Sequence, residues 1–167
     1  DINTSSSNDI TGWMFGTALP VAGRDSQAVV TKNRVYLFPN SGTTVHTAPI
    51  NGDGSLGAWT TTTSLPFQLS GTQAIVTKNR VHLLGGHNGT SPMPTVYTAP
   101  INADGTLGTW ATGTSLPGGL YQSTVLVTGS RVYLLGGYNE TEVTNAVFTA
   151  PINPDGTLGV WTTGTSI

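Results

Sequence analysis

The chain has 167 residues, a length that fits one domain. Charged residues make up 8% of it, against roughly 25% in an average soluble domain, whereas Ser and Thr together number 42. The formal net charge is −2 and Lys and Arg form no cluster, which argues against nucleic acid and anionic membranes as partners. No apolar run is long enough to span a bilayer. Cysteine is absent, which excludes disulfides, thiolate zinc sites and a cysteine nucleophile.

The chain begins with a segment rich in Ser, Asn and Asp, and then repeats one phrase. We interpret residues 1–11 as a linker or flexible segment, and residues 12–167 as a repeat region. Trp59, Trp110 and Trp161 are spaced by 51 residues, and each ends a near-copy of the sequence Pro-Ile-Asn-x-Asp-Gly-Ser/Thr-Leu-Gly-x-Trp. Trp13 precedes Trp59 by 46 residues. The repeat units therefore cover about 14–59, 60–110 and 111–161.

Each unit predicts four short strands. In the second unit the strands are expected at residues 72–77, 80–84, 95–101 and 107–115, with tight turns at 78–79 and 103–105. No segment has a sustained 3.6-residue period, so helices are not expected. Four short strands that recur at about 50 residues are typical of a propeller blade. The sequence therefore predicts an all-β fold of four-stranded antiparallel blades, repeated three times.

The third unit carries the motifs of a known repeat. Leu116-Pro117 is followed by a hairpin at 123–135 that ends in Gly136-Gly137, and then by Phe148 and Trp161. This order resembles a Kelch repeat, and the resemblance extends over about residues 12–167. The second unit has the double glycine as Gly85-Gly86, whereas the first unit has Pro39-Asn40. The resemblance implies a β-propeller of bacterial or viral surface type, and it implies no particular ligand.

Three blades are fewer than the 4 to 8 of typical propellers. Four blades of 51 residues would need 204 residues, and the chain has 167. Three explanations remain open at this point. The chain is part of a longer propeller, two or more copies close a ring together (two copies would give six blades), or another chain supplies the missing blades. The fourth-strand phrase occurs four times and the other strands three times, which favours the first explanation.

Two sets of loops are expected on one face of the blades, called here the top face. They are the connections from strand four to the next strand one and those between strands two and three. These loops vary in length and chemistry, as binding loops do, whereas the turns on the opposite bottom face are short and nearly constant. The candidate ligand-binding residues on the top face are Arg24, Asp25, Phe67, Gln68, His87, Asn88, Tyr121, Gln122, Tyr138, Asn139 and Glu140.

The repeated residues receive structural interpretations. Each Asp-Gly turn holds a single carboxylate (Asp53, Asp104 or Asp155), whereas a calcium loop needs 6–8 oxygen ligands, so we expect these aspartates to cap their own turns. The tryptophans at 13, 59, 110 and 161 are expected to pack between blades. The double glycines at 85–86 and 136–137 are expected to be structural. Neither a metal site nor a cofactor is expected.

Catalysis has little support in the sequence. Glycosidase chemistry needs two carboxylates at a set separation, and the top-face candidates are Asp25, Glu140 and Glu142. Solvated loop acids explain these residues as well. No nucleophile elbow, P-loop or HExxH motif occurs.

Three functions are compatible with these features. The first is a non-catalytic binding or adhesion module that recognises a glycan or a protein surface through its top loops. The second is a structural subunit of a fibre, appendage or capsid decoration, assembled through blade edges. The third is part of a propeller enzyme that acts on carbohydrate. The low charge and the abundance of Thr, Ser, Gly and Asn favour an extracellular, cell-surface or virion-surface location.

Overall fold

The computed structural model describes residues 16–21 and 24–165, so the segment 1–11 and Trp13 lie outside the described residues. These residues contain twelve strands and no helix, and thus no helix that could cross a membrane. The strands form three four-stranded antiparallel sheets, each in simple chain order. The predicted all-β fold with three four-stranded blades is therefore confirmed.

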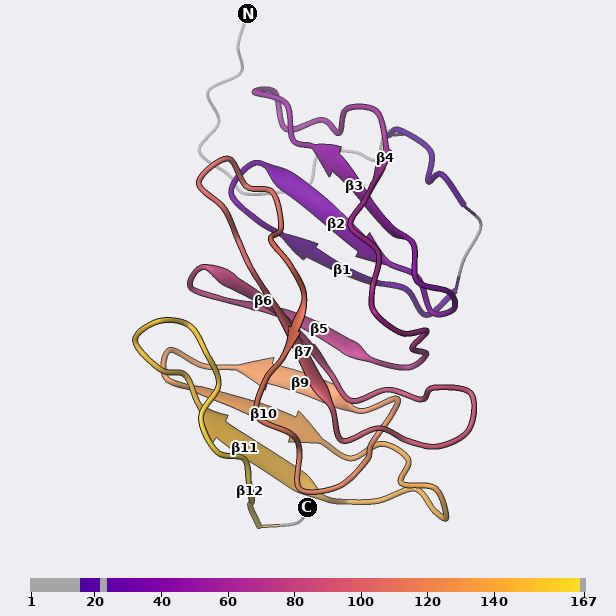
Figure 1. Cartoon of the computed structure of the whole chain (residues 1–167), viewed down its shortest axis with the longest axis vertical. Coiled ribbons are helices and arrows are strands. Elements are labelled where there is room, and N and C mark those ends of the chain that lie inside the picture. The colour runs from indigo at the N-terminus through magenta and orange to yellow at the C-terminus, as the bar shows by residue number, and fades with distance from the viewer. Residues whose placement is uncertain (1–15, 22–23, 166–167) are drawn as a thin grey trace, which may run out of the picture.

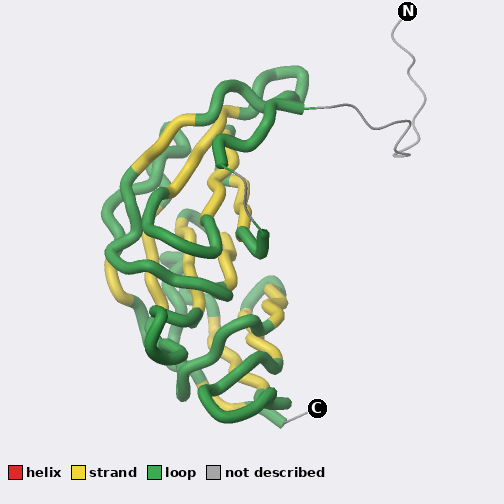
Figure 2. Tube along the Cα trace, turned by 90° about the vertical axis from the view of Figure 1, so that its right-hand side faces the viewer, coloured by secondary structure: helices red, strands yellow, loops and turns green. Residues whose placement is uncertain are grey.

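The three sheets are called blades 1, 2 and 3. They lie one below the other along the long axis of the molecule (Figure 1), and seen from the side of the top face they follow an arc (Figure 2). Blade 1 consists of β1 (Gln27–Val30), β2 (Arg34–Phe38), β3 (Val45–Pro49) and β4 (Thr60–Thr62). Blade 2 consists of β5 (Gln73–Thr77), β6 (Arg80–Leu84), β7 (Val96–Pro100) and β8 (Ala111–Thr112). Blade 3 consists of β9 (Thr124–Val127), β10 (Arg131–Leu135), β11 (Val147–Pro151) and β12 (Thr162–Thr163).

The first strands of the blades are neighbours, since β1 contacts β5 and β5 contacts β9. They therefore line the inner side of the arc, and the fourth strands lie at its outer rim. The strands form because short β-branched runs are interrupted by tight turns. In blade 2, for example, Lys78 takes a left-handed φ of 47° and allows β5 to return directly as β6.

The fourth strand of each blade is much shorter than the nine residues expected at 107–115. Leu107 pairs with Ile101, but Ala111 pairs with Thr98, so the register slips by one residue between these pairs. Thr109 and Trp110 thus face Ala99 together, which is the arrangement of a β-bulge. The same slip occurs in blades 1 and 3. A bulge re-aims a side chain, and here it lies at the repeated tryptophan.

The hydrophobic core lies between blades. The interface of blades 1 and 2 is called the first seam, and that of blades 2 and 3 the second seam. At the first seam Phe38 of blade 1 packs edge-on against Trp110 of blade 2, with ring centroids 5.8 Å apart. At the second seam Leu84 of blade 2 shares a buried cluster with Trp161 of blade 3. Each sheet therefore has a trailing face, which meets the next blade in the chain, and a leading face, which meets the preceding one.

Polar side chains join the blades at the bottom of each seam. The carbonyl of Gly105 accepts hydrogen bonds from the Tyr36 hydroxyl at 3.1 Å and from Thr31 Oγ1 at 3.0 Å. The equivalent carbonyl of Gly156 accepts from His82 Nε2 at 3.0 Å and from Thr77 Oγ1 at 2.6 Å. The Asp-Gly turns of blades 2 and 3 are therefore also the docking points for the preceding blades.

The two seams differ near the top face. At the second seam Gly86 N donates to Leu120 O at 2.8 Å, and a Cβ on Gly85 would collide with the same carbonyl. Gly85 has a φ of +60°, so this position demands glycine for both backbone conformation and space. At the first seam, where the glycines are replaced, the Asn40 side chain accepts a hydrogen bond from Gly71 N at 2.7 Å.

Candidate functional site

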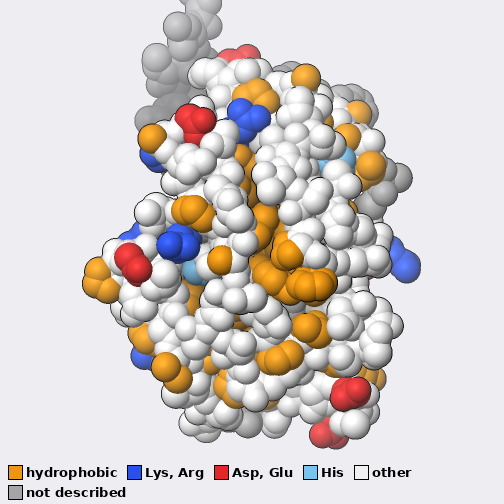
Figure 3. Space-filling view, in the orientation of Figure 1, with side chains coloured by type: hydrophobic (Ala, Val, Ile, Leu, Met, Phe, Trp, Pro, Cys, Tyr) orange, Lys and Arg blue, Asp and Glu red, His pale blue; other side chains and the backbone are white. Residues whose placement is uncertain are grey.

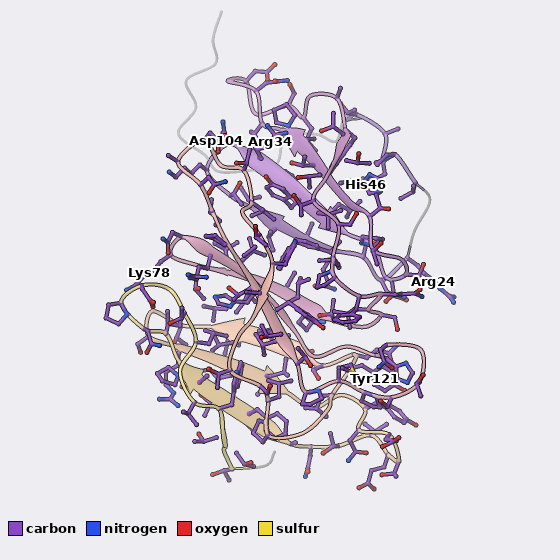
Figure 4. All side chains as sticks on the ribbon, viewed as in Figure 1. Arg24, Arg34, His46, Lys78, Asp104 and Tyr121 are labelled. Atoms are coloured by element: carbon purple, nitrogen blue, oxygen red, sulfur yellow. The ribbon has the colours of Figure 1, made fainter. Side chains whose placement is uncertain are left out.

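The loops predicted to form the top face are joined to each other by backbone hydrogen bonds. In blade 2, Ser70 N donates to His87 O at 3.0 Å and His87 N donates to Ser70 O at 2.8 Å. In blade 3, Tyr121 and Tyr138 exchange the equivalent bonds at 3.1 and 2.9 Å. Figure 4 shows Arg24 and Tyr121 on one side of the molecule and Lys78 and Asp104 on the other, so the top loops and the bottom turns lie on opposite sides.

Three aromatic rings form a row on this face. The centroids of His87 and Tyr121 lie 5.2 Å apart with an edge-on geometry, and those of Tyr121 and Tyr138 lie 5.6 Å apart with tilted planes. His87 comes from the β6–β7 loop, Tyr121 from the β8–β9 loop and Tyr138 from the β10–β11 loop. Tyr138 is 38% exposed. The row therefore crosses the second seam and presents ring surface to solvent.

The asparagines of two top loops accept hydrogen bonds from the backbone of their own loops. Asn88 Oδ1 accepts hydrogen bonds from the backbone N–H groups of Thr90 and Ser91, both at 2.9 Å. Asn139 Oδ1 accepts from Thr141 N at 3.2 Å and Glu142 N at 3.0 Å. Side-chain carbonyls used in this way form Asx turns, which fix the loop conformation. These two amides thus shape the loops that carry His87 and Tyr138.

Three top-loop residues at equivalent repeat positions have left-handed backbone conformations. They are Asp25 with φ 55°, Gly71 with φ 61° and Gln122 with φ 54°. A left-handed conformation costs a non-glycine residue about 1–2 kcal/mol. Glu140 pays a similar cost at φ 70°, where the equivalent residue of blade 2 is Gly89. The side chains of Asp25, Gln122 and Glu140 are therefore held at positions that would be more stable as glycine.

Asp25 and Gln122 line one small pocket at the inner side of the arc. Its volume is about 290 Å³, and Gly71, Thr72 and Ser123 contribute to its wall together with Gln27 and Gln73. The backbone ties this region together, since Gln122 N donates to Gly71 O at 2.7 Å across the second seam. This pocket, called here the axial pocket, offers carboxylate, amide and hydroxyl groups to a polar ligand.

The sequence prediction missed Gln27 and Gln73 as members of the axial pocket. Both are the first residues of their inner strands, β1 and β5, and were assigned to strands and not to loops. One signal was present, because a glutamine occurs at the same repeat position in two units. The third unit has Thr124 there.

Glu140 lines a different cavity. That cavity has a volume of about 300 Å³ and is bounded by Pro92, Gly118, Gly119, Asn139 and Thr141. It exists because glycines stand where the preceding unit has Phe67-Gln68, and a Cβ on Gly119 would collide with the Pro92 carbonyl. The carboxylates of Asp25 and Glu140 therefore face separate spaces.

The remaining candidates are spread over the top face. Arg24 lines a cavity of about 590 Å³ beside blade 1, which also includes Asn40 and the buried His46. Phe67 is 59% exposed, and its ring centroid lies 6.0 Å from that of Tyr97. Gln68 is exposed. The top face is sparsely charged, in keeping with the few scattered charges visible on the adjoining side of the molecule in Figure 3.

The bottom aspartates each bind the residue two positions later. Asp53 Oδ1 accepts from Ser55 Oγ at 2.7 Å and from Ser55 N at 2.9 Å, and Asp104 and Asp155 make the same pair of bonds. These hydrogen bonds to the side chain and then the backbone lower the pKa of all three carboxyls. Within the described residues no group of three His, Asp or Glu side chains could hold a metal ion.

The second seam contains buried polar atoms without partners. Arg34 Nε donates to Thr47 Oγ1 at 3.2 Å, and Arg131 Nε donates to Thr149 Oγ1 at 3.1 Å. At the equivalent place in blade 2, Arg80 Nε and Thr98 Oγ1 have no hydrogen-bond partner, and neither has His82 Nδ1. All three residues line a cavity of about 650 Å³. Burial, and secondarily the positive charge of Arg80, lower the pKa of His82 from 6.5 to about 4.

Comparison with known proteins identifies the fold and not the function. No protein-family model and no curated protein matches the chain. The solved structure of YjhT, a Kelch-type propeller, matches it with a TM-score of 0.71 and 11% sequence identity. The match covers 91% of this chain and 54% of that chain. The chain thus has a propeller-like fold and spans about half the length of this structural neighbour.

Proposed function

We propose that the chain is a non-catalytic binding module that recognises carbohydrate through its top face, in an extracellular or virion-surface protein. The observation that carries this proposal is the row of rings formed by His87, Tyr121 and Tyr138. It crosses a seam on the same face as the axial pocket. Aromatic faces stack on the apolar side of a sugar ring, while amides and carboxylates pair with its hydroxyls.

The composition of the top face supports a neutral, polar ligand. Charges are few, and the axial pocket combines Asp25 with Gln27, Gln73 and Gln122. Non-glycine residues in left-handed conformations are found preferentially at functional sites, where their side chains justify the strain. Asp25, Gln122 and Glu140 fit this description.

Binding is favoured over hydrolysis by the arrangement of the acids. Glycosidases generally place two carboxylates roughly 5 to 9.5 Å apart on either side of one bond. Asp25 and Glu140 line separate cavities, and among the described residues Asp25 is the one carboxylate that lines the axial pocket. A role in a propeller enzyme therefore has less support than a binding role.

A structural role in a fibre, appendage or capsid decoration has one observation in its favour. Blade 3 exposes apolar side chains on its trailing face, among them Leu126 at 54% exposure. Such faces mark interaction surfaces. This role differs from carbohydrate binding in its dependence on blade edges and not on top loops.

A glycan array followed by titration calorimetry tests the proposal. We expect Tyr121→Ala and Tyr138→Ala each to weaken binding at least about tenfold, because each removes stacking surface. Val160→Ala is the matched control, since Val160 is 73% exposed and lies outside the top loops. Silence across a broad glycan panel, with the protein folded, would contradict the proposal. Binding that survives both tyrosine variants would do so too.

A further inference from the structure

The trailing face of blade 3 differs from those of blades 1 and 2 in exposure and not in residue type. The position of Val29 in blade 1 and Ile75 in blade 2, 7% and 5% exposed, is held in blade 3 by Leu126, which is 54% exposed. Tyr133 and Leu135 are half-buried and Thr128 is exposed, whereas their counterparts at both seams are buried. Blade 3 therefore carries the residues of a seam without a blade against them.

The polar part of the seam is present in blade 3 as well. At the second seam Thr77 and His82 donate to the carbonyl of Gly156 in the next blade. Blade 3 has Thr128 and Tyr133 at these positions. Thr128 Oγ1 instead donates within its own turn, to Arg131 O at 3.1 Å. The face thus has donors suited to the carbonyl of an Asp-Gly turn.

Blade 1 carries the docking turn that would accept hydrogen bonds from such donors. Its turn has the same Asn-x-Asp-Gly-Ser/Thr-Leu-Gly phrase as the turns that dock at both seams. A Cβ on Gly105 would meet Asn33 and one on Gly156 would meet Asn79, each from the preceding blade, whereas a Cβ on Gly54 would meet nothing within 4 Å. The space beside Gly54 is therefore open, whereas Leu56 of the same turn is contacted by Thr17.

We propose that the trailing face of blade 3 binds the leading face of blade 1 in a second copy of this chain, so that two copies close a six-bladed ring. The contact repeats a seam that the chain already makes twice. Two copies of three blades give six, within the 4 to 8 of typical propellers, whereas three copies would give nine. The match to the YjhT propeller covers 54% of that chain, so two copies together have about the length of one such propeller.

The arrangement is head-to-tail, and a two-fold axis along the centre of the ring closes it. Each copy then contributes to the same centre, where the axial pocket lies on the inner side of the arc. Asp25, Gln27, Gln73 and Gln122 would occur there twice. The ring thus holds two copies of the axial pocket, related by the two-fold axis.

One segment has to move for the ring to close. Thr17 Oγ1 donates to Leu56 O at 2.7 Å, just as Thr114 Oγ1 of blade 2 donates to Leu158 O of blade 3 at 3.1 Å. Thr165 stands at the repeat position of Thr17 and Thr114. In the ring, Thr165 of one copy takes the place of Thr17 on the other. Removing residues 1–20 is therefore expected to strengthen the dimer.

Light scattering of the purified chain over a range of concentrations gives the first test. We expect a particle of 2 × 17.3 = 34.6 kDa. Leu126→Glu should weaken self-association at least about 100-fold, because it buries an unpaired charge in the new seam. Leu126 is exposed in a single chain, so the variant should keep its fold, which circular dichroism checks. Val143→Glu, also at an exposed valine (69%) but on a top loop, is the matched control.

Mixing variants tests the direction of the contact. Leu56 of blade 1 stands at the repeat position of Leu107 and Leu158, which are buried at the two seams. Leu126→Glu and Leu56→Glu should each be monomeric alone, and together they should form a heterodimer through the one unmodified seam. A 17.3 kDa particle at every concentration, with or without residues 1–20, would overturn the proposal. A dimer insensitive to Leu126→Glu, no rescue on mixing, or an open polymer would overturn it too.

Discussion

At the first seam the hydroxyl of Tyr36 reaches the carbonyl of Gly105, whereas at the second seam the imidazole of His82 reaches the carbonyl of Gly156. The docking turn is the same in both, so the geometry of the seam is set by the Asp-Gly turn and tolerates a different donor. The histidine at this position is accompanied by three buried polar atoms that lack hydrogen-bond partners, which destabilises the second seam. The first seam keeps its Arg34–Thr47 hydrogen bond. We therefore expect substitutions and low pH to destabilise the second seam more than the first.

The largest effect is expected at Gly85, which only the second seam uses as a contact. Gly85→Ala should lower the free energy of unfolding by about 3 kcal/mol, through left-handed strain and a clash with the Leu120 carbonyl. Gly136→Ala is the matched control. It has nearly the same φ, +58°, but its nearest atom is Thr144 O at 3.3 Å, so we expect a loss of only about 1–2 kcal/mol. Urea unfolding measures both, and equal losses would contradict the contact.

The next largest effect is a pH dependence of stability, which we expect from His82 at the second seam. The pKa of His82 is about 4 in the folded chain and 6.5 when unfolded, so the unfolded state binds the extra proton between these values. Stability should therefore fall as the pH drops from 6.5 towards 4, by up to about 3 kcal/mol. The bottom aspartates, with lowered pKa values, act below this range.

His82→Tyr supplies the comparison, since it installs the residue of the first seam. The variant should lose most of this pH dependence while remaining folded at pH 7. Urea unfolding at pH 4.5 and pH 7 on both proteins gives the difference. An unchanged slope in the variant would assign the pH dependence to groups other than His82.

The smallest effect is expected at Asn40, which replaces the double glycine at the first seam. Asn40→Ala leaves the Gly71 N–H without its acceptor at 2.7 Å, and we expect a loss of about 1–2 kcal/mol. Asn40→Asp keeps an acceptor oxygen and should lose less. If Asn40→Ala and Asn40→Asp unfold at the same urea concentration, the hydrogen bond from Gly71 N to residue 40 does not stabilise the first seam.

The sequence located some elements closely and others poorly. Strand β6 was expected at 80–84 and is found at Arg80–Leu84, because a short, mostly apolar run between a tight turn and a double glycine has clear ends. The fourth strand was expected to be nine residues long and is two or three residues long. A bulge precedes it in each blade, including blade 1, which has no preceding blade among the described residues. The bulge is defined by the pairing with the third strand, which residues 107–115 alone do not reveal.

The sequence predicted which loops form the top face, but not which of their residues share a cavity. Loop variability indicated which residues belong to the top face, but the loops divide them among separate cavities, with Asp25 in one and Glu140 in another. The prediction that chemistry-bearing residues lie in loops also left out Gln27 and Gln73. Both begin strands that line the inner side of the arc.

The sequence by itself determined the three repeat units of this chain, their four-stranded composition and the identity of the repeated turns. These features follow from local periodicity and turn chemistry, which recur every 51 residues and need no distant partner. Only the tertiary structure decided which side chains meet across the seams. It also showed that His82 is buried beside unpartnered atoms and that the seam residues of blade 3 are uncovered. These features depend on contacts between residues about 70 to 80 positions apart, so the packing of one blade on the next determines them.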